Sequence, residues 1–290
     1  MTHTKEKAMK SSPSLLLLDA YDLSGRNMLT KFGVTLAGEL FNEKIKKYLP
    51  DARVDLKFPA DQDCPLPSPT ELKNYDGVLW TGSSLTIHHK SPEVLRQIEF
   101  AVKTYESGVP AFGSCWAAQL AAVAAGGSCG PHPLGREFGI GRKITLSDSG
   151  KDHFLFQGKS EIFDALTSHT DHIERLPEKA TLLAGNSYSA VQALEVRHLN
   201  GTFSAIQYHP EYDLEVIAGL AKLRSDELIS LNYFRDQEDC NSYTDKLVIL
   251  HHNPERRDIS WQFGLGLDVL DPDIRDLEFR NWLRHGLGQG

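Results

Sequence analysis

The sequence contains no long apolar run, and this absence limits where the protein can work. The first apolar run covers only Leu15 to Leu18 before Asp19 intervenes, which is too short for the apolar region of a signal peptide. No later run approaches the length of a membrane span. We therefore expect a cytoplasmic protein that has no membrane partner.

Cysteine is also scarce, with 4 residues in a chain of 290. Without a secretory signal, so few cysteines in a chain of this length indicate reduced thiols rather than a disulfide framework. Cys64 and Cys240 are expected in loops, and neither they nor Cys129 has an evident base. Only Cys115 stands in a sequence context that is typical of a nucleophile.

Several binding signatures are missing as well. The chain has 31 Lys and Arg against 39 Asp and Glu, and its formal net charge of −8 argues against nucleic acid as a partner. Gly264-Leu-Gly266 lacks the third glycine of a dinucleotide fingerprint, and no Gly-Lys-Ser/Thr phosphate loop occurs. His169, Asp171 and His172 match no common zinc spacing. We expect no cofactor and no metal site.

What the first half does contain is an alternation of strand-like and helix-like segments. Apolar runs predict strands at 14–19, 53–58, 77–80 and 109–112. Helical periodicity predicts helices at 33–49, 91–106 and 116–125. Because such alternation favours a parallel sheet, we expect a doubly wound α/β fold, in which sites form at the carboxyl ends of strands.

The second half is richer in strands. Further strands are predicted at 142–146, 181–183, 190–196 and 202–208. Asn200-Gly201 should join the last two as a hairpin, and a helix over 214–234 should close the core.

Three segments follow from this pattern. They are a flexible N-terminal tail (1–13), a main domain (14–235) and a C-terminal extension packed on the core (236–290). Trp261, Phe279 and Trp282 are the expected packing residues of the extension.

Cys115 lies between a strand-like run that ends near Phe112 and an alanine-rich, helix-like run that begins at Trp116. A cysteine at such a junction sits on a sharp turn at a helix N-terminus, where unpaired N–H groups and the helix dipole favour the thiolate. A buried, inert cysteine is the alternative. The position therefore predicts a nucleophile only if the chain also supplies a base.

A base and its orienting acceptor occur in Gln207-Tyr-His-Pro-Glu211. His209 and Glu211 are two residues apart at the end of a predicted strand, so their side chains point to the same side. Pro210 fixes its own φ and keeps His209 out of the helical region. A His-Pro-Glu sequence alone could be an ordinary strand exit, but together with Cys115 it predicts a Cys-His-Glu triad.

A thiolate that attacks an amide carbonyl creates an oxyanion, which N–H donors must stabilise. The backbone N–H of Trp116, directly after the nucleophile, is one candidate. The other lies in the turn Thr81-Gly82-Ser83, where Gly82 allows the backbone to approach a ligand closely. The alternative for Gly82 is a simple turn glycine.

These motifs resemble those of class I glutamine amidotransferases, and most of all the glutaminase domain of GMP synthases. Members of that family carry a Gly-rich oxyanion turn, a Gly-x-Cys-x-Gly-x-Gln elbow, a Ser-His-x-Asp stretch and a terminal His-Pro-Glu. The corresponding segments are 81–83, 113–119, 168–171 and 209–211. The resemblance covers about 14–234, and it implies a flavodoxin-like three-layer sandwich with a mostly parallel central sheet.

The resemblance also implies roles for individual residues. Cys115 would attack the side-chain amide of glutamine, His209 would act as base and then as acid, and Glu211 would orient His209. Gln119 and the backbone of Ser168 and His169 would hold the α-amino and α-carboxylate end of the substrate. The main domain would then be a class I glutamine amidotransferase-like domain.

Two positions depart from the family pattern. Ala117 stands where the family usually has glycine, and Ser83 replaces a Gly-Pro continuation of the oxyanion turn. Two interpretations are open. Either the two residues reshape the acyl pocket for a γ-glutamyl amide whose amine is bulkier than ammonia, or they are tolerated and have no functional consequence.

Four functions remain open on the sequence. A glutaminase would pass ammonia to a synthetase partner, since the ATP-pyrophosphatase domain of a full GMP synthase is absent from this sequence. A stand-alone enzyme would cleave a γ-glutamyl amide and release a small amine. The remaining two are a non-catalytic binding or regulatory homologue and a related cysteine hydrolase that acts on other amides or peptides.

Overall fold

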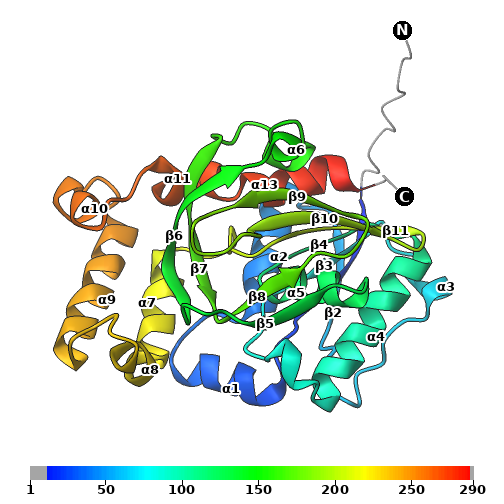
Figure 1. The fold of residues 1–290 in the computed structure, drawn as a ribbon, viewed down its shortest axis with the longest axis horizontal. Coiled ribbons are helices and arrows are strands. Elements are labelled where there is room, and N and C mark those ends of the chain that lie inside the picture. Colours follow the sequence, from blue (N-terminus) through cyan, green and yellow to red (C-terminus); the bar gives the residue numbers. More distant parts are fainter. Residues whose placement is uncertain (1–11, 288–290) are drawn as a thin grey trace, which may run out of the picture.

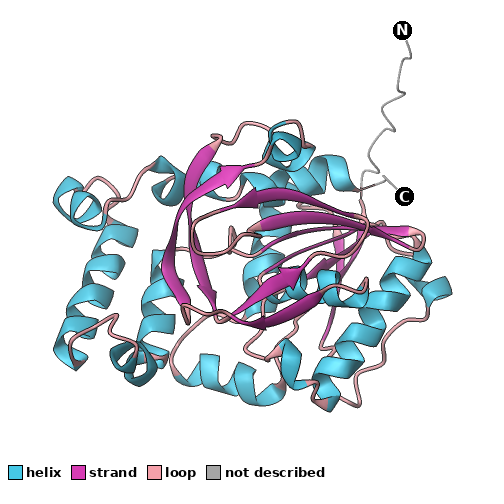
Figure 2. Ribbon diagram, viewed as in Figure 1, coloured by secondary structure: helices cyan, strands magenta, loops and turns pink. Residues whose placement is uncertain are grey.

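The computed structural model describes residues 12–287 of the chain. Its centre is a nine-stranded sheet with the strand order β2-β1-β3-β4-β11-β10-β9-β6-β7, and a second sheet consists of β5 and β8. The strands fan through the middle of the molecule and the helices surround them (Figures 1 and 2). Residues 1–11 of the expected N-terminal tail (1–13) lie outside the described residues.

The elements have the following bounds. The strands are β1 (Ser14–Leu18), β2 (Arg53–Lys57), β3 (Gly77–Trp80), β4 (Ala111–Ser114), β5 (Ser128–Pro131), β6 (Glu137–Leu146), β7 (Ile162–His169), β8 (Asp171–Arg175), β9 (Ala180–Gly185), β10 (Ala193–His198) and β11 (Gly201–Ile206). The helices up to the last strand are α1 (Leu23–Lys31), α2 (Ala37–Tyr48), α3 (Pro69–Leu72), α4 (Pro92–Ser107), α5 (Trp116–Ala124) and α6 (Asp148–Lys151). Those after it are α7 (Leu214–Leu223), α8 (Ser225–Ser230), α9 (Gln237–His252), α10 (Arg257–Phe263), α11 (Leu267–Leu270), α12 (Pro272–Arg275) and α13 (Leu277–Asn281). Short helical turns are η1 (Ile87–His89), η2 (Phe154–Phe156) and η3 (Trp282–Gly286).

The large sheet has a parallel half and an antiparallel half. β1 pairs in parallel with β2 and β3, β3 with β4, and β4 with β11. Beyond β11, the strands β10, β9, β6 and β7 pair antiparallel, and β10 and β11 form the predicted Asn-Gly hairpin. The order β2-β1-β3-β4-β11 is the flavodoxin-like order, so the predicted α/β fold is confirmed.

Alternate residues of the central strand β1 enter opposite layers of the core. Leu16 and Leu18 belong to a hydrophobic cluster with residues of α4 and α5. Leu15 and Leu17 belong to a second cluster with residues of α2 and α13. All four leucine side chains are fully buried, as expected for a strand that is covered by helices on both faces. Helix, sheet and helix therefore form three layers.

Two predicted helices differ from the structure. The helix expected over 33–49 begins only at Ala37 and is preceded by α1, whose N-cap Asp22 accepts a hydrogen bond from the N–H of Gly25 at 2.8 Å. The helix expected over 214–234 is divided into α7 and α8. Arg224 lies at the junction, with φ −110° and ψ 19°, and it ends one helix and begins the next.

The segment after α8 is more helical than expected. α9 lies beside α7 at the left of the view (Figure 1), and it contains Cys240, which is buried in a helix rather than placed in a loop. Phe279 packs edge-on against Phe112 at 5.6 Å, and Trp282 stacks on Phe112 at 5.5 Å between ring centroids. Trp261 is 75% exposed, so the expectation that it packs on the core is wrong.

A buried charged cluster connects this segment with the end of β11. Lys159 Nζ lies 3.1 Å from Glu278 Oε2, and the two side chains are 1% and 0% exposed. The Tyr208 hydroxyl donates to Glu278 Oε1 at 2.6 Å. Burial and the Glu278 carboxylate raise the pKa of Tyr208 well above its ordinary value, so the phenol keeps its proton. Tyr208 directly precedes His209, and α13 therefore fixes the chain beside that histidine.

None of the helices within residues 12–287 is long and apolar enough to cross a membrane.

Candidate active site

Cys115 occupies the sharp turn between β4 and α5. Its φ of 53° and ψ of −99° lie outside the regions that residues with a side chain favour, as in a strained nucleophile turn. The Cys115 N–H donates to the carbonyl oxygen of Ile206 at 2.7 Å, which ties the turn to β11. The sulfur lies 3.8 Å from the carbonyl oxygen of Ser168, at the end of β7. The predicted elbow is thus present in the backbone.

Gly113 makes the elbow compact. A Cβ atom at Gly113 would lie 2.2 Å from the carbonyl oxygen of Trp80 and 2.4 Å from the Cβ of Ala117. Ala117 itself is fully buried in the cluster formed by β1, α4 and α5 and does not line the cavity in front of Cys115. The expectation that the Ala117 methyl group reshapes the acyl pocket is therefore not supported by its position.

His209 and Glu211 form the orienting pair that their spacing predicted. His209 Nδ1 lies 2.6 Å from Glu211 Oε1, and the two side chains are 2% and 1% exposed. The Ser114 hydroxyl donates to the same carboxylate oxygen at 2.8 Å. The ring of Tyr212 stacks on the imidazole with 3.8 Å between centroids and an angle of 3° between the planes. Together these contacts fix the orientation of the His209 ring.

The protonation of His209 follows from its two neighbours. Burial lowers the pKa of an imidazole, but the charges of Glu211 and Cys115 outweigh burial and raise the pKa of His209 to about 9. Nδ1 faces Glu211, whereas Nε2 is buried and has no hydrogen-bond partner among the described residues. An imidazolium with one uncommitted N–H is suited to stabilise a thiolate and to protonate a leaving group.

Gly82 lies directly against this pair. A Cβ atom at Gly82 would lie 2.8 Å from His209 Cε1 and 3.6 Å from Cys115 Cβ, so only glycine fits without displacing the imidazole. The Thr81 hydroxyl donates to the Gly82 carbonyl oxygen at 2.8 Å and fixes the turn. Within residues 12–287, the backbone N–H groups of Gly82 and Trp116 donate no hydrogen bond. Neither N–H group is therefore used within this part of the protein.

A cavity of about 150 Å³ opens in front of Cys115. Its walls come from the turn after β3, the start of α5, the start of β6, the β7–β8 turn and the α7–α8 junction. The lining residues are Ser83, Ser84, Leu85, Cys115, Trp116, Gln119, Arg136, Ser168, His169, Thr170, Asp171 and Arg224. The structure thus brings Cys115, Trp116, Gln119, Ser168 and His169 to one cavity, while Gly82, His209 and Glu211 are not part of its lining.

The side chains of Gln119 and His169 are held by the protein itself. Gln119 Nε2 donates to the carbonyl oxygen of Asp171 at 3.1 Å. His169 Nδ1 lies 2.9 Å from the same oxygen, and His169 Nε2 lies 2.8 Å from Glu137 Oε2. Burial raises the pKa of a carboxyl, but contact with His169 outweighs it and lowers the pKa of Glu137. These side chains shape the β7–β8 turn, so its backbone faces the cavity in a fixed position.

Two functional candidates were not found from the sequence. Arg136, just before β6, and Arg224, between α7 and α8, both line the cavity. Neither belongs to a recognisable motif, and Arg224 falls inside a range that was predicted as one continuous helix. Ser114, which holds Glu211, could have been noticed as the polar end of an otherwise apolar strand.

Among the described residues, no group of three or more His, Cys, Asp or Glu side chains is placed to hold a metal ion.

Comparison with known proteins gives one family match and several relatives. The sequence model of "Glutamine amidotransferase class-I" matches residues 37–219. A γ-glutamyl-L-1-hydroxyisopropylamide hydrolase from a Pseudomonas species is 31% identical over 274 residues, which are 93% of this chain and 92% of that protein. A glutamine-hydrolysing GMP synthase from Clostridium botulinum is 30% identical over 138 residues, which are 48% of this chain and only 25% of that protein.

A solved structure extends the match to three dimensions. The crystal structure of a glutamine amidotransferase from Thermotoga maritima superposes with a TM-score of 0.60 and covers 96% of this chain and 99% of that one. The sequence identity is 16%, so this likeness bears on the fold alone.

Proposed function

Because this chain belongs to the class I glutamine amidotransferase family, we propose that it hydrolyses the amide bond of a γ-glutamyl amide through a thioester on Cys115. The observation that carries the proposal is the pairing of Cys115, on a strained strand-to-helix turn, with the buried His209–Glu211 pair. The family match and the full-length likeness to a γ-glutamyl amide hydrolase support the same reaction.

The first half of the reaction forms the thioester. The Cys115 thiolate attacks the γ-carbonyl carbon, and the oxyanion that forms accepts hydrogen bonds from the backbone N–H groups of Gly82 and Trp116. The His209 imidazolium then gives the Nε2 proton to the amide nitrogen, the C–N bond breaks, and the amine leaves. Cys115 now carries the γ-glutamyl group, and His209 is neutral.

The second half regenerates the enzyme. Neutral His209 takes a proton from a water molecule, and the resulting hydroxide attacks the thioester carbonyl carbon. The C–S bond breaks, glutamate leaves, and the Cys115 thiolate and the His209 imidazolium are restored. Glu211 stays ionised throughout, since its task is to hold the Nδ1 proton and the ring orientation.

Substrate contacts beyond the reacting bond are assigned to the β7–β8 turn and α5. Gln119 and the backbone of Ser168 and His169 line the cavity beside Cys115, and we assign them to the α-amino and α-carboxylate end of the γ-glutamyl group. Ser83, which stands where the family has a Gly-Pro continuation, also lines the cavity. We therefore expect the Ser83 side chain to influence the shape of the acyl pocket.

The extent of the matches favours an amine over ammonia as the released product. The Pseudomonas hydrolase aligns across the C-terminal helices of this chain, whereas the alignment with the GMP synthase covers about half of the chain. Likeness to the GMP synthase supports a second candidate, a glutaminase that passes ammonia to a synthetase partner. The two differ in whether amine is released from γ-glutamyl amides without any added protein.

A product assay distinguishes these functions. The purified chain is incubated alone with glutamine, γ-glutamyl ethylamide and γ-glutamyl isopropylamide, and released ammonia and amine are quantified. We expect amine release that is lost in Cys115→Ala and unchanged in Cys64→Ser, a matched cysteine outside the cavity. Ammonia release from glutamine only after a synthetase is added would favour the second candidate.

A covalent label tests the nucleophile separately from turnover. A diazo-ketone analogue of glutamine should modify Cys115 stoichiometrically, and mass spectrometry of the digested protein locates the adduct. A chain that releases no product and takes up no label would be a non-catalytic homologue. Labelling that γ-glutamyl compounds fail to prevent would favour a hydrolase for other amides.

A further inference from the structure

Two arginines converge on one wall of the Cys115 cavity. Arg136 reaches it from the start of β6 and Arg224 from the corner between α7 and α8. They come from segments that are far apart in the sequence, and both lie outside the segments that carry the triad. Arginine is well suited to bind planar anions, because its guanidinium group presents parallel N–H donors to both oxygens of a carboxylate.

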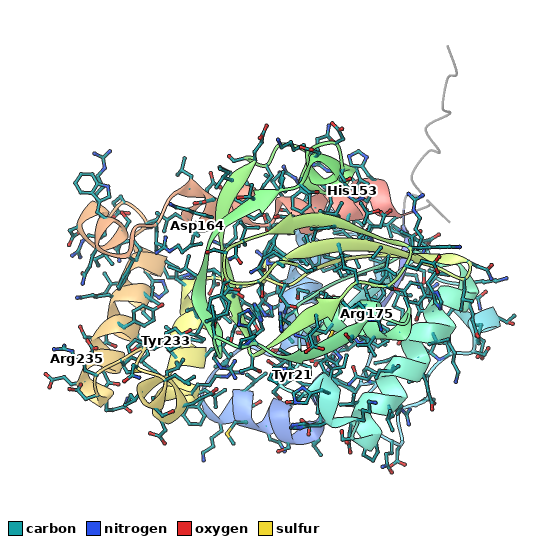
Figure 3. All side chains as sticks on the ribbon, in the orientation of Figure 1. Tyr21, His153, Asp164, Arg175, Tyr233 and Arg235 are labelled. Atoms are coloured by element: carbon teal, nitrogen blue, oxygen red, sulfur yellow. The ribbon has the colours of Figure 1, made fainter. Side chains whose placement is uncertain are left out.

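Arg136 is fixed by its neighbours. Its Nε donates to Glu227 Oε1 at 2.9 Å, and its Nη1 donates to the Ser168 hydroxyl oxygen at 3.4 Å. Tyr233, beside the lower end of β6 in Figure 3, donates its hydroxyl to the Arg136 carbonyl oxygen. The guanidinium is therefore held at the cavity wall and does not swing into solvent.

Arg224 has no such partner. Within residues 12–287 its side chain forms no ion pair and no hydrogen bond, and its Nη1 is buried without a partner. A buried, unpaired donor on a charged group is costly, so proteins rarely keep one unless a ligand uses it. Arg136 and Arg224 line the same cavity, and burial, followed by the charge of Arg224, lowers the pKa of Arg136.

The neighbouring acidic groups do not neutralise this pair. Glu227 is matched with Arg136 and is 41% exposed. Asp171, which also lines the cavity, lies 2.8 Å from His88 Nδ1. Burial raises the pKa of Tyr21, which lies just above α1 in Figure 3, so its phenol stays neutral. The wall carries two guanidinium groups for one partly exposed carboxylate.

We propose that Arg136 and Arg224 form a carboxylate-binding subsite of the active-site cavity, with Arg224 as the main contact. The inference rests on the proposed hydrolysis of γ-glutamyl amides and adds the recognition element of the substrate. The carboxylate has two possible sources, the α-carboxylate of the γ-glutamyl group or a carboxylate on the amine that leaves. Either source completes the hydrogen bonds of Arg224 and neutralises the excess charge.

The test measures binding to the Cys115→Ala variant, so that no ligand is consumed. Isothermal titration calorimetry compares γ-glutamyl ethylamide, γ-glutamylglycine and N-ethyl-4-aminobutanamide, which is the first compound without its α-carboxylate. Each ligand is titrated into Cys115→Ala with Arg224 intact and with Arg224→Gln, Arg224→Lys or Arg235→Gln added. Arg235 is the matched control, since its side chain is 83% exposed and pairs with Asp239 at the surface (Figure 3).

We expect Arg224→Gln to raise the Kd of a carboxylate ligand by roughly 10- to 100-fold, as for loss of charged hydrogen bonds. Arg224→Lys should retain part of the affinity, and Arg235→Gln all of it. If the α-carboxylate is the source, γ-glutamyl ethylamide and γ-glutamylglycine lose affinity equally and N-ethyl-4-aminobutanamide loses none. If the amine carries it, only γ-glutamylglycine is affected.

Three results would overturn the proposal: no binding of any ligand at millimolar concentration, an unchanged Kd in Arg224→Gln, or an equal loss of affinity for the ligand that lacks a carboxylate.

In the active enzyme, Arg224→Gln should raise KM far more than it lowers kcat for the affected substrates. If Arg224-dependent binding is found but the enzyme releases no amine from any amide, the proposed function fails and the subsite stands.

Discussion

Two sides of the site around Cys115 are built in different ways. Cys115, Gly82, His209 and Glu211 are here called the nucleophile wall, although only Cys115 among them lines the cavity itself. They follow the carboxyl ends of parallel strands, and buried neighbours fix their orientation. Arg136 and Arg224, the arginine wall, stand just before an antiparallel strand and at a helix corner. In the proposed mechanism, the reaction thus uses the parallel half of the sheet, and recognition of the substrate uses elements outside it.

Removing the proposed nucleophile, the Cys115 thiol, should distinguish the two walls by the largest effect. Cys115→Ala should lower kcat by on the order of 10⁴-fold or more, because the thioester can no longer form. Ligand binding should persist, because the arginine wall is untouched. Initial rates of amine release and calorimetric affinities, compared with Cys64→Ser, check this. Residual turnover within tenfold of the wild type would mean that Cys115 is not the nucleophile.

Glu211→Gln should weaken the nucleophile wall and change its pH dependence. The His209 pKa of about 9 depends on Glu211 and Cys115, so activity in the wild type should fall as pH rises through about 9 and the imidazolium loses its proton. Without the carboxylate that raises this pKa, the alkaline limb should move to lower pH, and kcat should fall roughly a hundredfold to ten-thousandfold.

The measurement is kcat as a function of pH for the wild type and for Glu211→Gln. A variant that keeps the wild-type alkaline limb would show that Glu211 does not set the charge of His209.

Gly82→Ala tests the contact between the turn after β3 and His209. The new methyl group would lie 2.8 Å from His209 Cε1, so the imidazole must shift. We expect kcat to fall roughly 10- to 100-fold, as for a misplaced catalytic group, with little change in thermal stability. Steady-state kinetics and a melting curve measure both. A large drop in the melting temperature with normal kcat would assign Gly82 a purely structural role.

Ala117→Gly should have the smallest effect on the reaction. The methyl group packs against Gly113 below the cavity, so the ratio of the rates with glutamine and γ-glutamyl ethylamide should change by less than about threefold. Stability should fall by about 1 kcal/mol, since glycine disfavours a helix. Ala124→Gly, near the other end of α5, is the control for the helix effect. A tenfold change in the rate ratio would restore Ala117 as a determinant of substrate choice.

The nucleophile wall was predictable because its signals are local. The strand 77–80 was predicted with its observed bounds, and the elbow at Cys115 and the i, i+2 pair His209–Glu211 depend on a few adjacent residues. The roles of these residues in catalysis remain predictions. The sequence also indicated the β10–β11 hairpin, because Asn-Gly determines its turn.

The arginine wall was not predictable for the opposite reason. Arg224 ends α7, but no glycine or proline occurs in residues 225–234, so the helical pattern runs on past it. Its proximity to Arg136 depends on how distant segments pack, and no spacing in the sequence reports that. α9 was overlooked among polar residues, although Cys240, Thr244 and Leu247 repeat at helical spacing and Asp236 caps the helix.

The buried contact of Glu278 with Tyr208 and Lys159 has a consequence for biosynthesis. Glu278 lies 70 positions after Tyr208 and 119 positions after Lys159, so the ribosome releases it well after the residues that it holds. Until then Lys159 has no buried carboxylate partner, and Tyr208, which precedes His209, lacks the acceptor for its hydroxyl. We expect nascent chains that stop before Leu277 to be cleaved rapidly in pulse proteolysis, whereas chains that include Asn281 resist. Positioning of His209 would thus wait until α13 has been made.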